Sequence, residues 1–285
     1  MTRRRFLAGC AGAAAGVASL GGYAALVEPR RVGFTRHAAN ARTSAHQRHL
    51  TLVQLSDLHL HGVGDVHRRM AARVNALRPD LVVFTGDSVD TPGRLGTLAA
   101  LLALLDARTP KYAILGNWEH WSGVDLGELA DVYRRAGCRL LVNESILHPV
   151  QGRALRVTGL DDLVGGRPDP GRAMAGAAVA DAHLLLAHCP GHRDLLAPMP
   201  TPLDPTAASL DPAGVTLMLS GHTHGGQVRL LGWTPVLPGG SGRYVQGWFR
   251  EPGAAPMYVS RGVGTSMVPV RLGAPPEVAV FTLWV

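Results

Sequence analysis

The sequence predicts an α/β fold with a mostly parallel sheet. Between residues 50 and 136, short runs rich in leucine and β-branched residues alternate with amphipathic stretches, the pattern of β-α-β units. Each strand-like run ends at a polar or glycine-bearing segment, where a strand would stop. The second half is richer in strand-like runs, and neither a repeat nor a separate second domain is evident. With 285 residues, 46% of them hydrophobic, the chain can bury a sizeable core.

The expected elements follow in chain order. In the first half, we expect strands at 49–56, 80–85 and 111–115, and helices at 66–77, 97–107 and 126–136. In the second half, we expect buried strands at 153–159, 183–187 and 215–220, and a strand-rich end at 227–231, 243–248, 257–261 and 277–285. Residues 28–49 are expected to be a polar linker, and the proline-rich segment 199–214 a surface loop.

The formal net charge of +7 is concentrated near the N-terminus. Residues 1–50 hold eight arginines and a single acid, Glu28, whereas the other 235 residues hold 20 basic and 20 acidic side chains. A nucleic-acid-binding protein would carry its excess charge on the folded domain, so we expect no nucleic-acid-binding surface. Three cysteines and no CxxC motif are too few for a disulfide framework, although a bridge between Cys138 and Cys189 remains open.

Residues 1–27 resemble a twin-arginine export signal. Three consecutive arginines, residues 3–5, precede an uncharged stretch of mostly alanine and glycine that runs to residue 27. At about 1.5 Å per helical residue, this stretch is just long enough to cross a hydrocarbon core of about 30 Å. We therefore expect an export signal or a membrane anchor, and a protein that works at or outside the cytoplasmic membrane. A chance arginine run before a soluble helix is the alternative.

Side chains that can bind metal follow the three strands expected in the first half. Asp57 and His59 come directly after the first strand, and two residues apart on an extended chain they point to one side. Asp87 follows the second strand, and Asn117 follows the third. Because sites in open α/β sheets form at the carboxyl ends of strands, we expect these residues to converge in one crevice.

Three histidines in the second half extend this set. His188 follows one apolar run, and His222 and His224 follow the next, within a glycine-flanked Gly-His-Thr-His-Gly-Gly segment. Each motif alone is more often a turn or a structural residue, but the ordered set at successive strand ends is hard to obtain by chance. Carboxylate, imidazole and amide oxygen together suit Mn, Zn or Fe, and not a thiolate-bound structural zinc. The sequence therefore predicts a divalent metal site.

The order of these motifs resembles that of the calcineurin-like metallophosphoesterase superfamily. The motifs are DLH at 57–59, GDSVD at 86–90, GNWE at 116–119, a single His at 188 and GHTH at 221–224, and the resemblance covers residues 50–285. The segments GHTHGGQV and YVSRGVG resemble those of a bacterial membrane-associated or exported phosphodiesterase subgroup. This resemblance implies a catalytic domain at 50–285, folded as a two-sheet sandwich flanked by helices.

The resemblance also implies two metal ions and a division of the ligands. One ion would be held by Asp57, His59 and His224, the other by Asn117, His188 and His222, with Asp87 bridging both. Two divalent ions about 3.5–4 Å apart bind phosphate oxygens, lower the pKa of a water and stabilise an in-line transition state. The expected activity is hydrolysis of phosphoric esters, above all phosphodiesters.

Two other functions remain open beside a phosphodiesterase. One is a pyrophosphatase of a nucleotide-sugar lipid, of the UDP-2,3-diacylglucosamine type; that reaction belongs to the cytoplasmic face, so export would count against it. The other is a metal-binding protein whose catalysis has decayed. The expected substrate is therefore a phosphodiester or a pyrophosphate-linked compound, in some readings a lipid, and the expected membrane contact is through the N-terminus.

Trp118 departs from the superfamily pattern, which usually has histidine after the Gly-Asn pair. That histidine is thought to protonate the leaving group, whereas the indole of tryptophan is only a hydrogen-bond donor. His120 and His61 are the candidates to replace it, and we expect Asp87, Asn117 and His120 to act in catalysis. A leaving group of low pKa, such as a phosphate, would need little protonation.

Two residues are expected to contact the substrate. Gln227 follows the GHTHGG segment, and Arg261 lies in the YVSRGVG segment and could bind a phosphate. The alternatives are a tight turn at Gln227 and a structural ion pair at Arg261. Trp121 could form an apolar wall for a lipid-like substrate, with core packing as its alternative, and Asp161 could face the site or cap a loop.

Overall fold

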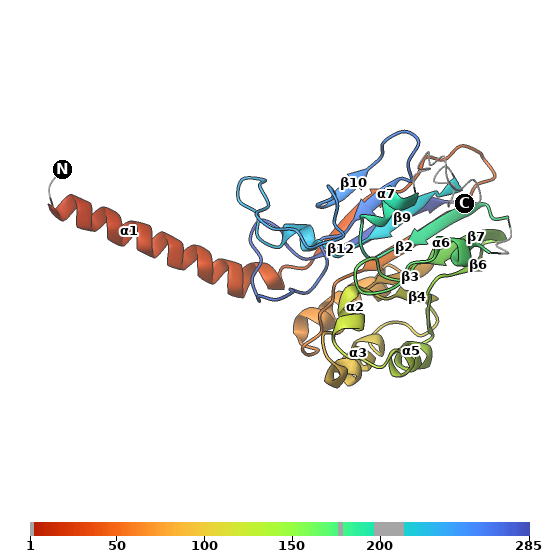
Figure 1. The fold of residues 1–285 in the computed structure, drawn as a ribbon, viewed down its shortest axis with the longest axis horizontal. Coiled ribbons are helices and arrows are strands. Elements are labelled where there is room, and N and C mark those ends of the chain that lie inside the picture. The colour runs from red at the N-terminus through yellow and green to blue at the C-terminus, as the bar shows by residue number, and fades with distance from the viewer. Residues whose placement is uncertain (1–2, 176–178, 197–213) are drawn as a thin grey trace.

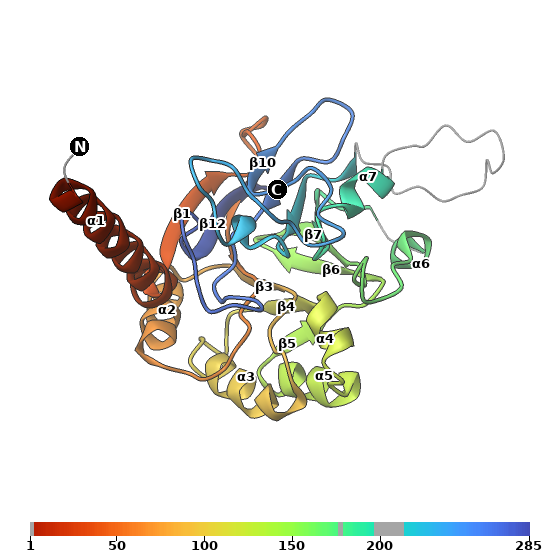
Figure 2. The same ribbon diagram turned by 60° about the vertical axis from the view of Figure 1, so that its left-hand side comes forward.

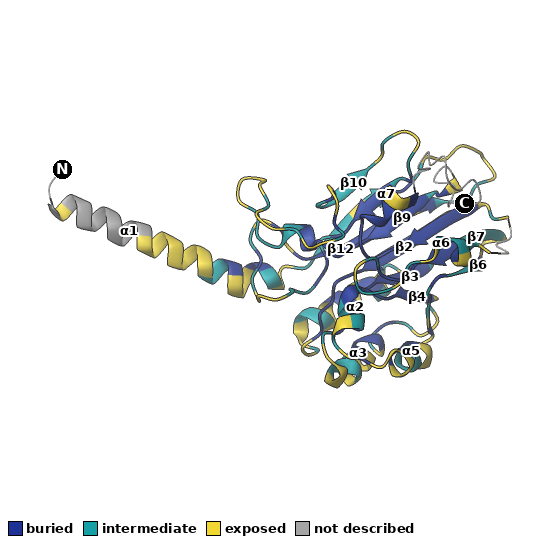
Figure 3. Cartoon of the chain, viewed as in Figure 1, coloured by how far each residue is buried: buried dark blue, intermediate teal, exposed yellow. Residues whose placement is uncertain are grey.

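Two six-stranded β-sheets pack against each other in the computed structural model of the protein, which describes residues 3–175, 179–196 and 214–285 (Figure 1). Helices flank the sheets, so the predicted α/β sandwich is confirmed. Most residues of the strands are buried, and the exposed residues lie mainly in the helices and loops (Figure 3).

The first sheet contains the parallel strands of the first half. Its strands, in spatial order, are β1 (Gly33–Ala38), β12 (Glu277–Trp284), β2 (His49–Leu55), β3 (Leu81–Thr85), β4 (Lys111–Ile114) and β5 (Cys138–Leu140). Strands β2 to β5 are parallel, and β12 runs antiparallel to β2. Helices α2 (Asp65–Ala76), α3 (Leu95–Leu102) and α5 (Leu126–Arg135) cover its outer face.

The second sheet is built from the later part of the chain. Its strands, in spatial order, are β10 (Gly247–Phe249), β11 (Met257–Val259), β9 (Leu217–Ser220), β8 (Ala182–Leu186), β7 (Arg153–Gly159) and β6 (Glu144–Val150). Strands β7, β8, β9 and β11 are parallel, and β6 and β10 are antiparallel edges. The short helices α6 (Pro170–Met174) and α7 (His192–Leu196) pack outside this sheet.

Alternation of side chains along each strand builds separate cores. In β2, Leu52 points between the sheets and Val53 points toward the helices, as the period of two requires. Leu52 meets residues of the opposite sheet such as Leu184 and Leu217 in one buried cluster. The two sheets are thereby held face to face, and the strand ends of both reach the same edge of the sandwich.

The N-terminal segment forms a helix that projects from the body. Helix α1 (Arg3–Gly22) continues into short helical turns at Tyr23–Val27 and Glu28–Arg30 (Figure 2). Within the described ranges, no helix combines the length and apolar content needed to cross a membrane.

The segment 28–49, expected to be a polar linker, contains β1. This strand pairs in parallel with β12 over six residues, from Gly33 beside Glu277 to Ala38 beside Thr282. As an edge strand it is only half-buried, so its sequence mixes polar and apolar residues and resembles a linker. The adjoining Glu28 is buried and accepts a hydrogen bond from the backbone N–H of Ala274.

The strand-rich end differs from the expectation. The strand expected at 227–231 is replaced by two isolated bridges, and the one expected at 243–248 shrinks to the three-residue β10. The helix expected at 97–107 ends at Leu102. The loop expected at 199–214 lies, up to residue 213, outside the described residues. Short edge strands carry little periodicity, so their bounds are hard to predict from the sequence.

Candidate metal centre

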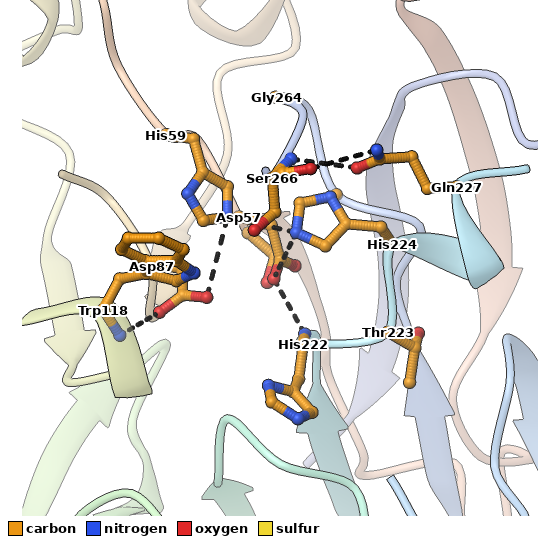
Figure 4. A network of polar contacts seen from close by, with 12 residues as sticks. Asp57, His59, Asp87, Trp118, His222, Thr223, His224, Gln227, Gly264 and Ser266 are labelled. Atoms are coloured by element: carbon orange, nitrogen blue, oxygen red, sulfur yellow. Dashed lines mark hydrogen bonds and ion pairs between the residues drawn. The ribbon is translucent and has the colours of Figure 1, made fainter. Parts of the chain in front are cut away.

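All seven residues predicted to bind metal lie together at the carboxyl ends of strands from both sheets. They are Asp57 and His59 after β2, Asp87 after β3, Asn117 at the start of helix α4 (Asn117–Trp121) after β4, His188 after β8, and His222 and His224 after β9. Each is buried, with at most 5% of its surface exposed. Figure 4 shows Asp57, His59, Asp87 and His224 pointing toward one another.

The first cluster consists of Asp57, His59, Asp87 and His224. Their ligand atoms all lie within 4.8 Å of one another. The Nε2 atoms of His59 and His224 are 3.0 Å apart, and Nε2 of His224 is 3.6 Å from Oδ1 of Asp57. Two imidazole nitrogens that share one ion at about 2.1 Å lie about 3.0–3.4 Å apart, so this spacing suits a common ion.

The second cluster consists of Asp87, His188 and His222, again with ligand atoms within 4.8 Å of one another. Nε2 of His188 lies 3.2 Å from Oδ2 of Asp87 and 3.3 Å from Nδ1 of His222. The same Nδ1 lies 2.9 Å from the side-chain Oδ1 of Asn117. Asp87 belongs to both clusters, the position that a bridging carboxylate requires.

The donor atoms of these residues fit divalent ions. Oδ2 of Asp57 is buried and has no hydrogen-bond partner, a costly state for a carboxylate unless a cation neutralises it. Nδ1 of His188 lies 2.7 Å from the carbonyl oxygen of Thr85, so Nδ1 carries the hydrogen and Nε2 is free to bind a metal. Nδ1 of His59 is held in the same way by Oδ1 of Asp90 at 2.6 Å.

The backbone is strained at the ligand positions. Asp57, His59, Asp87, His222 and His224 have φ angles of +49°, +42°, +53°, +72° and +51°, in the left-handed region. For a residue other than glycine this conformation costs roughly 1–2 kcal/mol. Because the cost falls on the ligands, the surrounding structure must hold them there, as is typical of functional sites.

Two glycines of the motifs allow the close approach of the strand ends. A Cβ atom on Gly116 would lie 2.3 Å from Oδ1 of Asp87, and one on Gly221 would lie 2.4 Å from Oδ2 of Asp57. Neither position can hold a side chain without displacing a ligand carboxylate. The glycines of GNWE and GHTH are therefore steric requirements of the site.

Burial and neighbouring charges set the protonation of the site. Burial raises the pKa of Asp87, but the imidazoles of His188 and His59 outweigh it and hold the pKa well below its usual range. Burial lowers the pKa of His59, and the hydrogen bond to Asp90 with the nearby carboxylates raises it above its ordinary value. Burial and the neighbouring His59 hold the pKa of His224 well below its ordinary value. Asp87 is thus ionised and His224 neutral, the forms that bind metal.

Glu119 supports the site in a role that the sequence reasoning did not assign. Its buried carboxylate accepts hydrogen bonds from the backbone N–H groups of Gly116 at 2.8 Å, Asp87 at 3.0 Å and Ser88 at 2.6 Å. It therefore joins the loop after β3 to the loop after β4. The spacing from Gly116 to Glu119 is that of a helix capping box, a signal that was available in the sequence.

Arg271 is a second supporting residue that no motif indicated. It is fully buried, and burial lowers its pKa to about 10. Its guanidinium donates hydrogen bonds to the carbonyl oxygens of Ala274 and Arg261, and its Nη2 lies 3.3 Å from Nδ1 of His224. It fixes the loop behind His224, and nothing in a proline-rich tail predicts a buried arginine.

Members of both clusters form the floor of a pocket of about 380 Å³. Asp87, Asn117, His222 and His224 contribute to the floor, and the walls are mainly apolar. The wall residues are Trp118, Trp121, Val228, Pro235, Val236, Pro238, Met267 and Val268, with Thr223, Gly226, Gln227 and Ser266 between them. An anion bound to the floor would thus be flanked by apolar surface.

Gln227 lines this pocket, but its amide is engaged with the chain. Its Nε2 donates to the carbonyl oxygens of Ser266 and Val268, both at 3.0 Å, and its Oε1 accepts from the N–H of Ser266 at 2.9 Å. The side chain predicted to contact substrate therefore ties two pocket loops together (Figure 4).

His120 and His61 are not brought into the pocket. Nε2 of His120 lies 2.8 Å from Oδ1 of Asp161, and this hydrogen bond raises the pKa of His120. Two helical positions separate His120 from Trp118, a turn of about 200°, so the two side chains leave α4 on opposite faces. His61 is mostly exposed and lies 3.6 Å from Asp90. His120 is thus not among the residues that line the pocket, and its role as the replacement proton donor stays a prediction.

Arg261 also lies outside the pocket. Its Nε donates to the carbonyl oxygen of Pro275 at 3.0 Å and lies 3.5 Å from the buried carboxylate of Glu277. The structure thus shows the structural ion pair, and the phosphate contact of Arg261 stays a prediction.

Cys138 and Cys189 are free thiols, and both are buried. Sγ of Cys189 donates to Oδ1 of Asp162 at 3.1 Å, and Oδ2 of Asp162 accepts from the N–H groups of Val164 and Gly165. The acidic pair at 161–162 therefore caps a loop instead of facing the metal centre.

Comparison with known proteins places this geometry in a family. Residues 50–226 match the family model described as calcineurin-like phosphoesterase. The chain is 32% identical over 295 aligned positions to the uncharacterized metallophosphoesterase YkuE of Bacillus subtilis (strain 168), covering 99% of this chain and 98% of the relative. It is 30% identical to the phosphodiesterase YaeI of Escherichia coli (strain K12), over 72% of this chain and 71% of the relative.

Among solved structures, the 5'-nucleotidase precursor of Thermus thermophilus is similar with a TM-score of 0.49 and 18% sequence identity. The match covers 83% of this chain and 54% of that one.

Proposed function

The chain belongs to the calcineurin-like phosphoesterase family and is a metal-dependent hydrolase of phosphoric ester bonds, and from this premise we propose that it is a binuclear phosphodiesterase acting at or outside the cytoplasmic membrane. The observation that carries the proposal is the position of Asp87, which belongs to both candidate metal clusters at the floor of one pocket. The location at the membrane is supported by the N-terminal arginine run and the projecting helix α1 of this chain.

The ligands divide between the two ions as the clusters do. Asp57, His59 and His224 would hold one ion, Asn117, His188 and His222 would hold the other, and Asp87 would contribute to both. When bound, divalent ions supply Lewis-acid charge to the phosphate and lower the pKa of water. The mixed nitrogen and oxygen donors suit Mn, Zn or Fe.

The protein's own contribution is to hold this constellation rigid and dry. Glu119 and Asp90 fix the ligand loops from behind, and the walls around Trp118 and Trp121 exclude water from one side of the bound phosphate. A substrate with one negative charge and apolar substituents matches both the floor and the walls, which favours a diester.

The pocket offers no good proton donor for the leaving group. Apart from the metal ligands, the described residues that line it include hydroxyl groups only at Thr223 and Ser266, and Trp118 stands where the family usually has histidine. We therefore expect the rate of the enzyme to depend strongly on how easily the leaving group departs.

The same observation supports a second candidate function, hydrolysis of a pyrophosphate-linked lipid, since a phosphate leaves without protonation. Retention of all seven ligands argues against decayed catalysis.

The proposal is tested by hydrolysis of bis(p-nitrophenyl) phosphate by the full-length protein. The protein is stripped with a chelator and then supplied in turn with Mn, Zn, Fe, Mg or Ca, with Asp87→Ala measured in parallel. We expect turnover to return with Mn, Zn or Fe and to stay absent in the variant. No turnover with any metal, although two ions bind, would reject the diesterase and direct the assay to pyrophosphate-linked lipids.

A further inference from the structure

Two loops at the mouth of the metal pocket expose an unusual number of large apolar side chains. In the loop 228–238, Leu231 is fully exposed, Val236 is 74% exposed and Trp233 is 65% exposed. In the loop 265–270, Met267 is 92% exposed and Val268 is 52% exposed. Apolar tips gathered around a functional pocket mark a binding surface, whereas scattered ones need no explanation.

These loops are held in place and do not owe their exposure to loose structure. The N–H of Arg229 donates to the carbonyl oxygen of Leu272, and the N–H of Leu272 donates to that of Gln227. The side-chain amide of Gln227, which directly precedes the first loop, is hydrogen-bonded to Ser266 and Val268 in the second. Reciprocal backbone bonds between Leu230 and Trp233 close a tight turn. This turn carries Leu231 at its tip with a φ of +51°, a strained conformation for leucine.

The charges around the loops exclude a basic partner. The segments 228–240 and 262–276 contain no aspartate or glutamate, and they contain two arginines, Arg229 and the buried Arg271. Arg30 and Arg31 are exposed at the base of the N-terminal helix. The surface is therefore apolar at its tips and neutral to positive around them.

The N-terminal segment joins the same side of the molecule. The N–H of Arg271 donates to the carbonyl oxygen of Ala24, and the N–H of Ala274 donates to Glu28. Leu26 and Val27 next to this junction are 59% and 44% exposed. Helix α1 projects from the side of the body that carries the two loops (Figures 1 and 2).

We propose that the loops 228–238 and 265–270 dock the catalytic domain on a lipid bilayer, so that the metal pocket opens onto phosphoric esters in the plane of the membrane. The inference that the substrate is carried by a lipid rests on the proposed function, whereas the inference that the loops dock on a bilayer does not. The surface combines separate aromatic and aliphatic tips with nearby arginines, and the two loops contain no acidic residues. This combination matches the interfacial region of an anionic bilayer. A rigid protein partner would instead need one continuous complementary face.

The test measures binding of the full-length protein to vesicles of phosphatidylethanolamine and phosphatidylglycerol by sedimentation. The variant Leu231→Asp/Trp233→Asp changes two tips that do not line the pocket, and the matched control is Leu147→Asp/Leu195→Asp, on distant surfaces. We expect the tip variant to lower the vesicle partition coefficient at least about tenfold and the control to leave it within about twofold. Turnover of bis(p-nitrophenyl) phosphate should not change in either variant.

Three results would overturn the docking surface. They are no vesicle binding by the unaltered protein, equal binding by the tip variant, and a change of oligomeric state in the tip variant, which would assign the loops to contacts between copies of the chain. Vesicle binding that depends on the tips, with no diester turnover under any metal, would leave the docking intact and reject only the proposed function.

Discussion

The metal crevice and the apolar rim above it are built in opposite ways. The seven candidate ligands lie at strand ends of both sheets and are nearly fully buried, and partners such as Glu119 and Asp90 hold them. The rim consists of the loops 228–238 and 265–270, and tip residues such as Leu231 and Met267 are almost fully exposed. The crevice is fixed by many mutual constraints, whereas the tips contact little of the rest of the chain. If the proposed docking holds, chemistry and membrane contact belong to separable parts of the molecule.

Removal of one ligand should have the largest effect and tests whether the crevice alone carries the chemistry. For His188→Gln we expect a loss of diester kcat/KM on the order of 10³-fold with reduced metal content, because the second cluster loses an imidazole. The matched control is His183→Gln, a buried histidine of β8 that lies 2.8 Å from the hydroxyl of Thr158 and outside the clusters. It should cost about 1 kcal/mol of stability and keep turnover. Similar turnover in both variants would contradict the assignment.

Loss of the support behind a ligand should have an intermediate effect. Asp90→Asn removes the charge that faces Nδ1 of His59 at 2.6 Å, and partners of this kind are typically worth about 10–100-fold in metal affinity or activity. Metal titration of the chelator-treated protein, followed by diester turnover, measures it. Asp131→Asn, on the exposed face of α5, is the control and should match the unaltered protein. An unchanged metal affinity in Asp90→Asn would show that the crevice does not depend on this contact.

The crevice was more predictable from the sequence than the contacts of the loops around it. Asp87 and His222 stand in short motifs at strand ends, where topology alone brings them together, so the crevice and the parallel strands were predictable. Glu119 was visible as a capping-box residue. The partners of Arg271 and Gln227 depend on loops that return from distant sequence positions, and no local periodicity encodes them.

Two residues were assigned to the site from their chemical type, but in the structure their side chains contact other parts of the chain. His120 is close to Asn117 in sequence, but the helix directs it to Asp161, and Arg261 is directed to Glu277. Spacing along the chain predicts a shared site only when the local backbone conformation is known.

Trp118 lies where crevice and rim meet, and its replacement should shift substrate preference more than overall rate. Trp118→His introduces a proton donor beside Asp87, so we expect kcat/KM for glycerophosphocholine, with its alkoxide leaving group, to rise about tenfold relative to bis(p-nitrophenyl) phosphate. The ratio of the two substrates in the same preparation is the measurement. Trp121→His, one helical turn away on the same wall, is the control. An unchanged ratio would show that protonation does not limit the reaction.

The smallest effect is expected at the ion pair of His120 with Asp161, which belongs to neither region. The hydrogen bond to Asp161 raises the pKa of His120, so its stabilisation is fully present below the unfolded-state pKa of about 6.5 and is lost as pH rises through the folded pKa. His120→Asn should therefore lower the free energy of unfolding by up to about 1 kcal/mol near pH 5.5 and by less near pH 9.

Chemical denaturation at the two pH values measures this difference, with His61→Asn, a mostly exposed histidine, as the control. Diester turnover of His120→Asn should stay within about twofold, whereas loss of a general acid would cost about 10²–10⁴-fold. A loss of that size would mean that His120 reaches the reacting phosphate after all, and that the crevice extends beyond the seven ligands. Unchanged turnover with the pH-dependent loss of stability would leave the ligands and the rim as the parts that act on the substrate.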